Sequence, residues 1–185
     1  MYKIPSLVMR KALIILGILD DSDIEWMIEN GQTVRLQVDD FLLRQNGHVE
    51  AIYFLLEGSL QVCLEHPEAR DLALLEPGEV VGEISLLDSR PATATLKASE
   101  SAILLSIPHD ILKPKLEHDL GFQARFYKAL GMFLAQRMRS TILAVGYGAD
   151  PSKEEDEEID EIEPQVLQAI ETAAKRFELM TSRAT

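Results

Sequence analysis

The residues best suited to bind a ligand lie close together in the segment 77–95. Within it, Gly82–Asp88 breaks a series of alternating strands and has the spacing of one short helical turn. Such a turn packs its apolar side chains on the body of the domain, while the backbone N–H groups at its first residues point outward. Ser85, Arg90 and Thr93 add two hydroxyls and a guanidinium. Because free N–H groups at a helix start attract anions, this segment indicates recognition of a small anion.

Other kinds of site chemistry find no support in the sequence. No nucleophile–base pair, phosphate loop or carboxylate pair of useful spacing stands out, so we expect a protein that is not an enzyme. The main alternative jelly roll, a metal-binding cupin, would need two histidines spaced by one residue, and the chain has none, so no metal site or cofactor is predicted. The single cysteine, Cys63, cannot form an internal disulfide, which fits a cytoplasmic protein.

The charge of the chain argues against two classes of partner. The net charge is −13, and residues 149–164 hold nine acidic residues against one lysine. Nucleic-acid binding needs a basic surface, because phosphate contacts supply most of its affinity. The apolar run Ala12–Leu19 is too short to span a membrane. We therefore expect no nucleic-acid partner and no membrane partner.

The elements that must position the segment 77–95 form a strand-rich body between helices. Residues 5–31 predict two short helices, the second starting with a capping box of Ser22 and Glu25. From residue 33 to 107, short apolar–polar alternations separated by turn signals predict a jelly-roll barrel. The predicted strands are 34–38, 52–56, 60–64, 72–75, 93–98 and 102–107. The fold class is therefore mainly β with flanking helices.

The rest of the chain is expected to be helical. Residues 108–145 predict a short helix with a break or kink caused by Pro114, then a long helix from Leu120 to Val145. We expect one domain over residues 1–145, with the barrel at about 33–107. An acidic linker, 146–164, and an amphipathic helix, 165–185, follow.

One stretch of the sequence resembles a known family. The segment Pro77–Leu87 resembles the phosphate-binding cassette of cyclic-nucleotide-binding domains, and Leu56–Leu60 is similar to a turn between strands of the same family. Such domains occur in catabolite activator protein, kinase regulatory subunits and gated channels. The resemblance covers about residues 10–145. It implies a cyclic nucleotide such as cAMP as ligand, with Gly82 approaching the phosphate and Glu83 accepting a hydrogen bond from the ribose 2′-hydroxyl.

The cassette departs from the family pattern at one position. The family has an arginine after its proline, but this chain reads Pro91-Ala92-Thr93-Ala94-Thr95, so Ala92 replaces the phosphate-binding arginine. Losing that contact removes about 2–5 kcal/mol from binding, so we expect reduced affinity for cAMP. Two alternatives for Glu83 stay open, capping of local amides and an ion pair with Arg90. The predicted ligand-binding residues are Gly82, Glu83, Ile84, Ser85, Arg90, Ala92 and Thr93.

Two functional hypotheses follow. The first is a non-catalytic sensor, in which a small anionic ligand moves the helices after Pro108 and an unidentified protein effector reads that movement. The second is a degenerate, ligand-free module for dimerisation or protein interaction. The resemblance implies a homodimer through residues 120–145, and the pattern Asp88–Pro91 is similar to that of bacterial members. The acidic residues after the long helix argue against the DNA-reading winged helix of the family's transcription factors.

Overall fold

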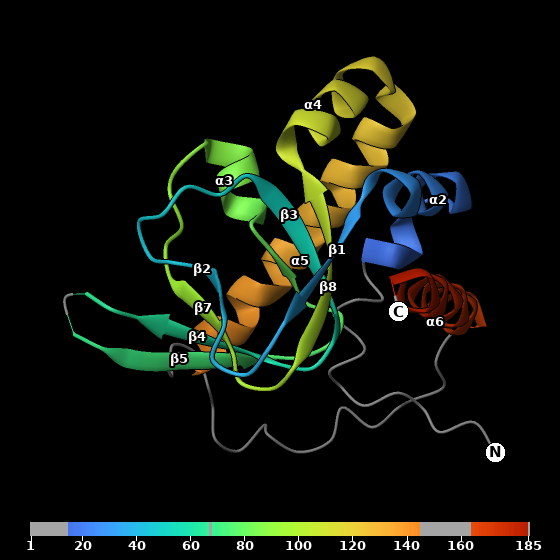
Figure 1. Cartoon of the computed structure of the whole chain (residues 1–185). Coiled ribbons are helices and arrows are strands. Elements are labelled where there is room, and N and C mark those ends of the chain that lie inside the picture. The colour runs from blue at the N-terminus through green and yellow to red at the C-terminus, as the bar shows by residue number, and fades with distance from the viewer. Residues whose placement is uncertain (1–14, 67, 145–163, 185) are drawn as a thin grey trace.

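Two antiparallel sheets form the body of the domain, and helices cover one side of it (Figure 1). The structure, a computed structural model, describes residues 15–66, 68–144 and 164–184. One four-stranded sheet has the order β1-β8-β3-β6 and the other the order β2-β7-β4-β5. The strands are β1 (Gln32–Leu36), β2 (Phe41–Leu43), β3 (Ala51–Glu57), β4 (Leu60–Leu64), β5 (Arg70–Leu75), β6 (Val80–Val81), β7 (Thr95–Ala98) and β8 (Ala102–Pro108). This confirms the predicted jelly-roll barrel with flanking helices.

The barrel has two hydrophobic cores, one on each side of the first sheet. Leu55, Leu60 and Leu104 are fully buried between the two sheets. Ile52 and Ile107 belong to the second core, which lies between the first sheet and the helices. Alternation along β3 and β8 explains this division, since successive side chains point to opposite faces of a sheet. Two short strands, β2 and β6, were not predicted, because three and two residues give no readable alternation.

The helix α2 (Asp21–Asn30) has Asp20 as its N-cap, two residues before the predicted N-cap Ser22. The expectation that Ser22 and Glu25 form the box is wrong. Asp20 caps the helix with an extended backbone, and the backbone N–H of Asp20 donates to Oδ2 of Asp23 at 2.8 Å. An aspartate at each position satisfies the free N–H groups as well as a serine–glutamate pair does. The helix ends before Gly31, as predicted. The first predicted N-terminal helix lies largely outside the described residues.

After the barrel, the chain forms α4 (His109–His118) and α5 (Leu120–Ala144). Pro114 lies inside α4 without ending it, and the break comes at Asp119. Asp119 has an extended backbone, and its Oδ1 accepts a hydrogen bond from the N–H of Phe122 at 2.9 Å, so it starts α5. Helix α5 covers one side of the barrel with a row of buried side chains, which are Phe122, Phe126, Ala129, Leu130 and Phe133.

The last helix, α6 (Pro164–Ala184), folds back onto the domain and lies beside α2 (Figure 1). Arg176 of α6 donates to Oδ1 of Asp21 at 2.7 Å and to the carbonyl oxygen of Leu16 at 2.6 Å. Ala173 and Met180 are buried in the core between sheet and helices. The segment predicted as a separate terminal helix therefore packs on the barrel domain. The predicted acidic linker lies outside the described residues, apart from Pro164.

Candidate functional site

The cassette helix α3 (Glu83–Asp88) starts at Gly82, which has a left-handed backbone with φ 86°. A Cβ at this position would lie 2.4 Å from the carbonyl oxygen of Ala51. Only glycine avoids both the strained φ and this contact, so Gly82 is required by the turn itself. The structure thus confirms the predicted helical turn between β6 and β7, and it shows why a glycine opens it.

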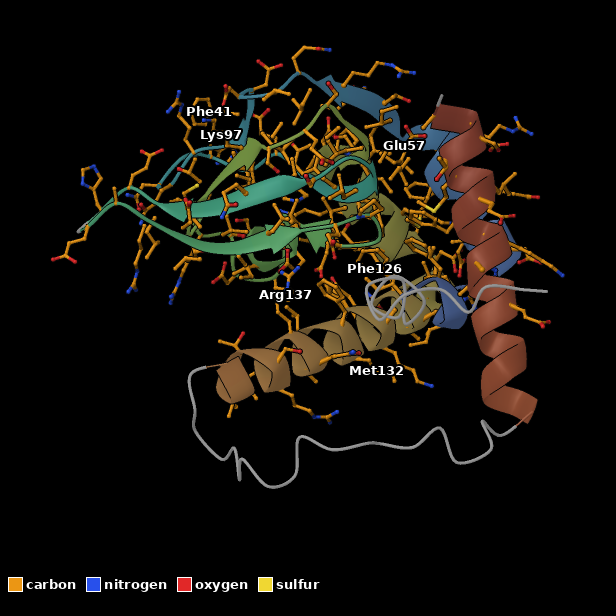
Figure 2. All side chains as sticks on the ribbon, turned by 90° about the horizontal axis from the view of Figure 1, so that it is seen from below. Phe41, Glu57, Lys97, Phe126, Met132 and Arg137 are labelled. Atoms are coloured by element: carbon orange, nitrogen blue, oxygen red, sulfur yellow. The ribbon has the colours of Figure 1, made fainter. Side chains whose placement is uncertain are left out.

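The side chain of Glu83 is buried and bound to Arg137 of α5. Nη1 of Arg137 donates to Oε1 of Glu83 at 2.5 Å, and Nη2 donates to Oε2 of Glu79 at 3.0 Å and to the carbonyl oxygen of Val80 at 2.8 Å. Both carboxylates are at most 5% exposed. Figure 2 shows Arg137 reaching from α5 towards the barrel. We call Arg137, Glu79 and Glu83 the Arg137 cluster.

The Arg137 cluster corrects the expectations for Glu83. An ion pair with Arg90 was one alternative, but the structure shows the partner to be Arg137, 54 residues away along the chain. Sequence reasoning missed Arg137. One signal was present, because Arg137 follows the buried Phe133 by one helical turn and so lies on the face of α5 that packs against the barrel.

Burial dominates the electrostatics of Glu83. Loss of water raises the pKa of Glu83, and this effect exceeds the lowering by the positive charge of Arg137. The neighbouring carboxylate of Glu79 raises the pKa further. One guanidinium therefore serves two buried acids and stabilises the charged form of Glu83 incompletely. A second hydrogen-bond donor beside Glu83 would compete directly with Arg137 for the carboxylate of Glu83.

The position of the family's phosphate-binding arginine holds a buried methyl group. Ala92 is 7% exposed, and its backbone is paired with a turn. Its N–H donates to the carbonyl oxygen of Gly47 at 2.9 Å, and its own carbonyl oxygen accepts from the N–H of Asn46 at 2.8 Å. Thr93, the next residue, is exposed. At this position the cassette offers a threonine hydroxyl and no cationic side chain.

Of the remaining predicted residues, Arg90 and Ile84 are exposed to solvent, and Ser85 and Arg90 line a cleft beside α4. The Arg90 side chain is 80% exposed, and its one ion pair within the described parts of the chain is with its near neighbour Asp88, at 3.6 Å between Nε and Oδ2. Ile84 is 39% exposed. Ser85 is buried, and together with Arg90 it lines a cleft towards α4 rather than the region of Glu83. Of the seven predicted residues, Ser85 and Arg90 line this cleft.

The outer face of α5 exposes a row of apolar side chains. The largest are Leu120, Tyr127, Met138 and Ile142, with 72%, 43%, 63% and 42% exposed. Met132 also points away from the barrel (Figure 2). Leu120, Tyr127, Met138 and Ile142 recur at the spacing of one helix face, opposite to the phenylalanines that pack on the barrel.

Neither a membrane helix nor a metal cluster is found in the described parts of the chain. No helix there is long and apolar enough to cross a membrane. Nor do the described residues bring three or more histidine, cysteine, aspartate or glutamate side chains together in a way that could hold a metal ion.

The fold and the cassette place this chain among known proteins. Residues 33–119, which comprise the barrel and α4, match the model of the cyclic nucleotide-binding domain family. The structure is similar to the N-terminal domain of a transcriptional regulator from Streptomyces coelicolor A3(2), with a TM-score of 0.58 and 28% identity, covering 71% of this chain and 91% of that one. It is also similar to the catabolite activator protein of Thermus thermophilus, with a TM-score of 0.61 and 24% identity, covering 72% and 62%.

A relative with a very different length is the lysophospholipase nte1 of Aspergillus fumigatus. It is 27% identical over 124 residues, which are 66% of this chain and 7% of that protein. The chain thus corresponds to a small part of nte1.

Proposed function

We propose that this chain is a non-catalytic regulatory module in which the cassette and α5 are coupled through Arg137. The observation that carries the proposal is the Arg137 cluster, because it joins the cassette to the long helix by one side chain. In this proposal the ligand is a small anion, cAMP or a similar molecule. A ligand hydroxyl that donates to Glu83 competes with Arg137, so ligand binding and the position of α5 depend on each other.

The packing of α5 supports such a movement. Its buried side chains end at Phe133, and among residues 134–142 none is buried. Beyond Phe133, the half-buried Leu134 packs against the core, and Arg137 supplies the polar contacts between this part of α5 and the cassette. When Glu83 turns to a ligand, we expect the end of α5 to separate from the barrel and present a changed surface to a protein effector.

Titration with cAMP and then cGMP tests the ligand. Since Ala92 supplies no guanidinium, we expect weak binding by the wild type and binding at least about tenfold tighter by Ala92→Arg. Ala73→Arg is the matched control, because it makes the same substitution at an exposed alanine of β5 outside the cassette. Isothermal titration calorimetry measures all three. If neither wild type nor Ala92→Arg gives heat at millimolar ligand, the cyclic-nucleotide proposal fails.

A second candidate function, a ligand-free dimerisation module, is favoured by the outer face of α5. Leu120, Ala124, Tyr127, Gly131, Leu134 and Met138 alternate at spacings of four and three residues, which is the pattern of a helix that pairs with a second helix. In this proposal two copies pair through residues 120–145.

Sedimentation equilibrium tests this pairing. We expect a dimer for the wild type, a monomer for the double variant Tyr127→Glu, Met138→Glu, and a dimer for Ser140→Glu, which adds a charge at an exposed polar position of the same helix. A monomeric wild type, or a dimer that survives the double variant, contradicts it.

A further inference from the structure

A cleft of about 420 Å³ lies between α3, the loop before β3 and the first turn of α4. Figure 1 shows α3 and α4 at the same end of the barrel. The cleft contains neither Glu83 nor Thr93 and is therefore distinct from the region of the Arg137 cluster. Its volume is within the range of pockets that hold small metabolites.

Basic side chains gather at this cleft in a chain that is otherwise strongly acidic. Arg90, Lys113, His48 and His109 line it, together with the carboxylates of Glu50 and Asp110. Arg90 has only the exposed pair with Asp88, and Lys113 forms no ion pair with another described residue. Both cations can therefore turn to a ligand without giving up a buried partner. A guanidinium and an ammonium on opposite walls suit a phosphate group.

The second observation that supports a ligand here is an unpaired nitrogen on the imidazole of His109. His109 is 9% exposed, and its Nε2 is buried without a hydrogen-bond partner among the described residues. Buried polar atoms in folded proteins are nearly always paired, so an unpaired Nε2 in a residue that lines the cleft marks a place where a small shift of the ring would let a ligand supply the partner. The backbone N–H of His109 donates to the carbonyl oxygen of Glu50 at 2.7 Å, which fixes the start of α4 against the loop.

We infer that this cleft is a second ligand site, which binds a small molecule through a phosphate group held between Arg90 and Lys113. Ser85 and Ser89, one helical turn apart on α3, add hydroxyl donors on the same wall. A ligand here bridges α3 and α4, because Ser85 and Ser89 belong to the cassette side and Lys113 to the helix that leads into α5. The inference does not depend on cyclic-nucleotide binding at Glu83.

Pyrophosphate is a compact probe for this site, and NMR of backbone amides and histidine rings is the readout. In the full chain, we expect millimolar pyrophosphate to shift the resonances of His48, His109 and Lys113 and to leave those of Gly82 and Thr93 in place. The reverse pattern, or no shift of any of them at about 20 mM probe, would overturn the inference.

Matched variants assign the phosphate contacts. The double variant Arg90→Gln, Lys113→Gln should weaken pyrophosphate binding by about tenfold or more, since two charge-assisted contacts are lost. The control Arg70→Gln, Lys128→Gln removes the same charge from exposed positions outside the cleft and should bind within about twofold of wild type. Because all four residues are exposed, we expect every variant to fold. Equal pyrophosphate binding by the two double variants would contradict the proposal.

Discussion

Two arginines of α5 bind buried carboxylates in different ways. Arg125 donates from Nε and Nη2 to the two oxygens of the buried Asp23, at 2.6 and 2.8 Å, and its Nη1 lies 3.2 Å from Oδ2 of the exposed Asp20. Arg137 divides its donors between Glu83, Glu79 and a backbone carbonyl. The first pair holds α5 to α2, and the Arg137 cluster holds α5 to the cassette. Both contain short ion pairs, but the pKa of Asp23 is lowered and the pKa of Glu83 is raised.

The pKa shifts show what the difference in geometry does. Burial acts to raise the pKa of Asp23, but the hydrogen bonds from Arg125 and from the backbone of Asp20, with the charge of Arg125, hold it below its usual range. For Glu83, burial prevails and the pKa is raised. Asp23 accepts hydrogen bonds from Arg125 at both oxygens and is stable as an ion, whereas Glu83 accepts from Arg137 at one oxygen and shares that guanidinium with a second buried acid. We therefore expect the Arg125 pair to be structural and the Arg137 cluster to be easily rearranged.

The largest effect should come from Arg125→Ala. It leaves the buried carboxylate of Asp23 without its partner, so we expect a loss of about 3 kcal/mol in the free energy of unfolding, measured by urea denaturation. Arg139→Ala, at an exposed position of the same helix, is the control and should resemble wild type. A loss below about 1 kcal/mol would remove the structural role of the pair.

Arg137→Ala should cost less, about 1–2 kcal/mol, because the raised pKa of Glu83 lets it take up a proton and avoid a buried unpaired charge. Its clearest effect should be local. Hydrogen exchange should accelerate after Phe133 and stay slow in the phenylalanine-lined part of α5. Lys128→Ala serves as the comparison on the same helix. Uniform acceleration along α5 would speak against a separate, easily rearranged segment.

The opposite pKa shifts predict opposite pH dependences. Between its folded and unfolded pKa, Asp23 binds fewer protons in the native state, so its stabilisation is present at neutral pH and is lost as the pH falls through the folded value. Glu83 binds more protons in the native state, so stability falls as the pH rises through its raised value.

Urea midpoints of Asp23→Asn and Glu83→Gln, measured from pH 3 to 7, test this. Asp23→Asn should be destabilising at pH 7 and less so at pH 3. Glu83→Gln should lie close to wild type at pH 7 and become relatively less favourable as the pH falls. If both variants change in the same direction with pH, the contrast between the two arginines is wrong.

The smallest effect is expected for a pair that is short but exposed. Nζ of Lys97 lies 2.6 Å from Oδ1 of Asp39, whose side chain is 74% exposed. Water screens such a pair, so Lys97→Gln should unfold at the same urea concentration as wild type. A clear shift of the midpoint would mean that a short distance matters more than burial of the acid, and the comparison above would lose its basis.

The order of elements, the barrel and the cassette helix followed from local sequence signals. Alternating strands, turn glycines and the run Gly82–Asp88 are short-range patterns, and the structure retains them. The candidate functional site was harder to predict from the sequence. The replacement of an arginine by Ala92 is readable from the sequence, but the sequence left the direction of the Arg90 side chain open.

Long-range pairs explain what was missed. Arg137 meets Glu83 only because α5 crosses the barrel at one angle, which no local pattern encodes. The cleft at His109 likewise joins three segments that lie far apart in the sequence. The capping box at Asp20 was missed for a simpler reason, since Asp20 and Ser22 are both good caps and sequence alone favours neither.

The spacing of the two arginines gives α5 the geometry of a lever. They are twelve residues apart, which is about 18 Å along a helix. If α5 pivots at Arg125, a tilt of about 10° moves Arg137 by about 3 Å, as far as a hydrogen bond is long. A small angular change is therefore enough to break every contact of Arg137, while side chains nearer to Arg125 move less.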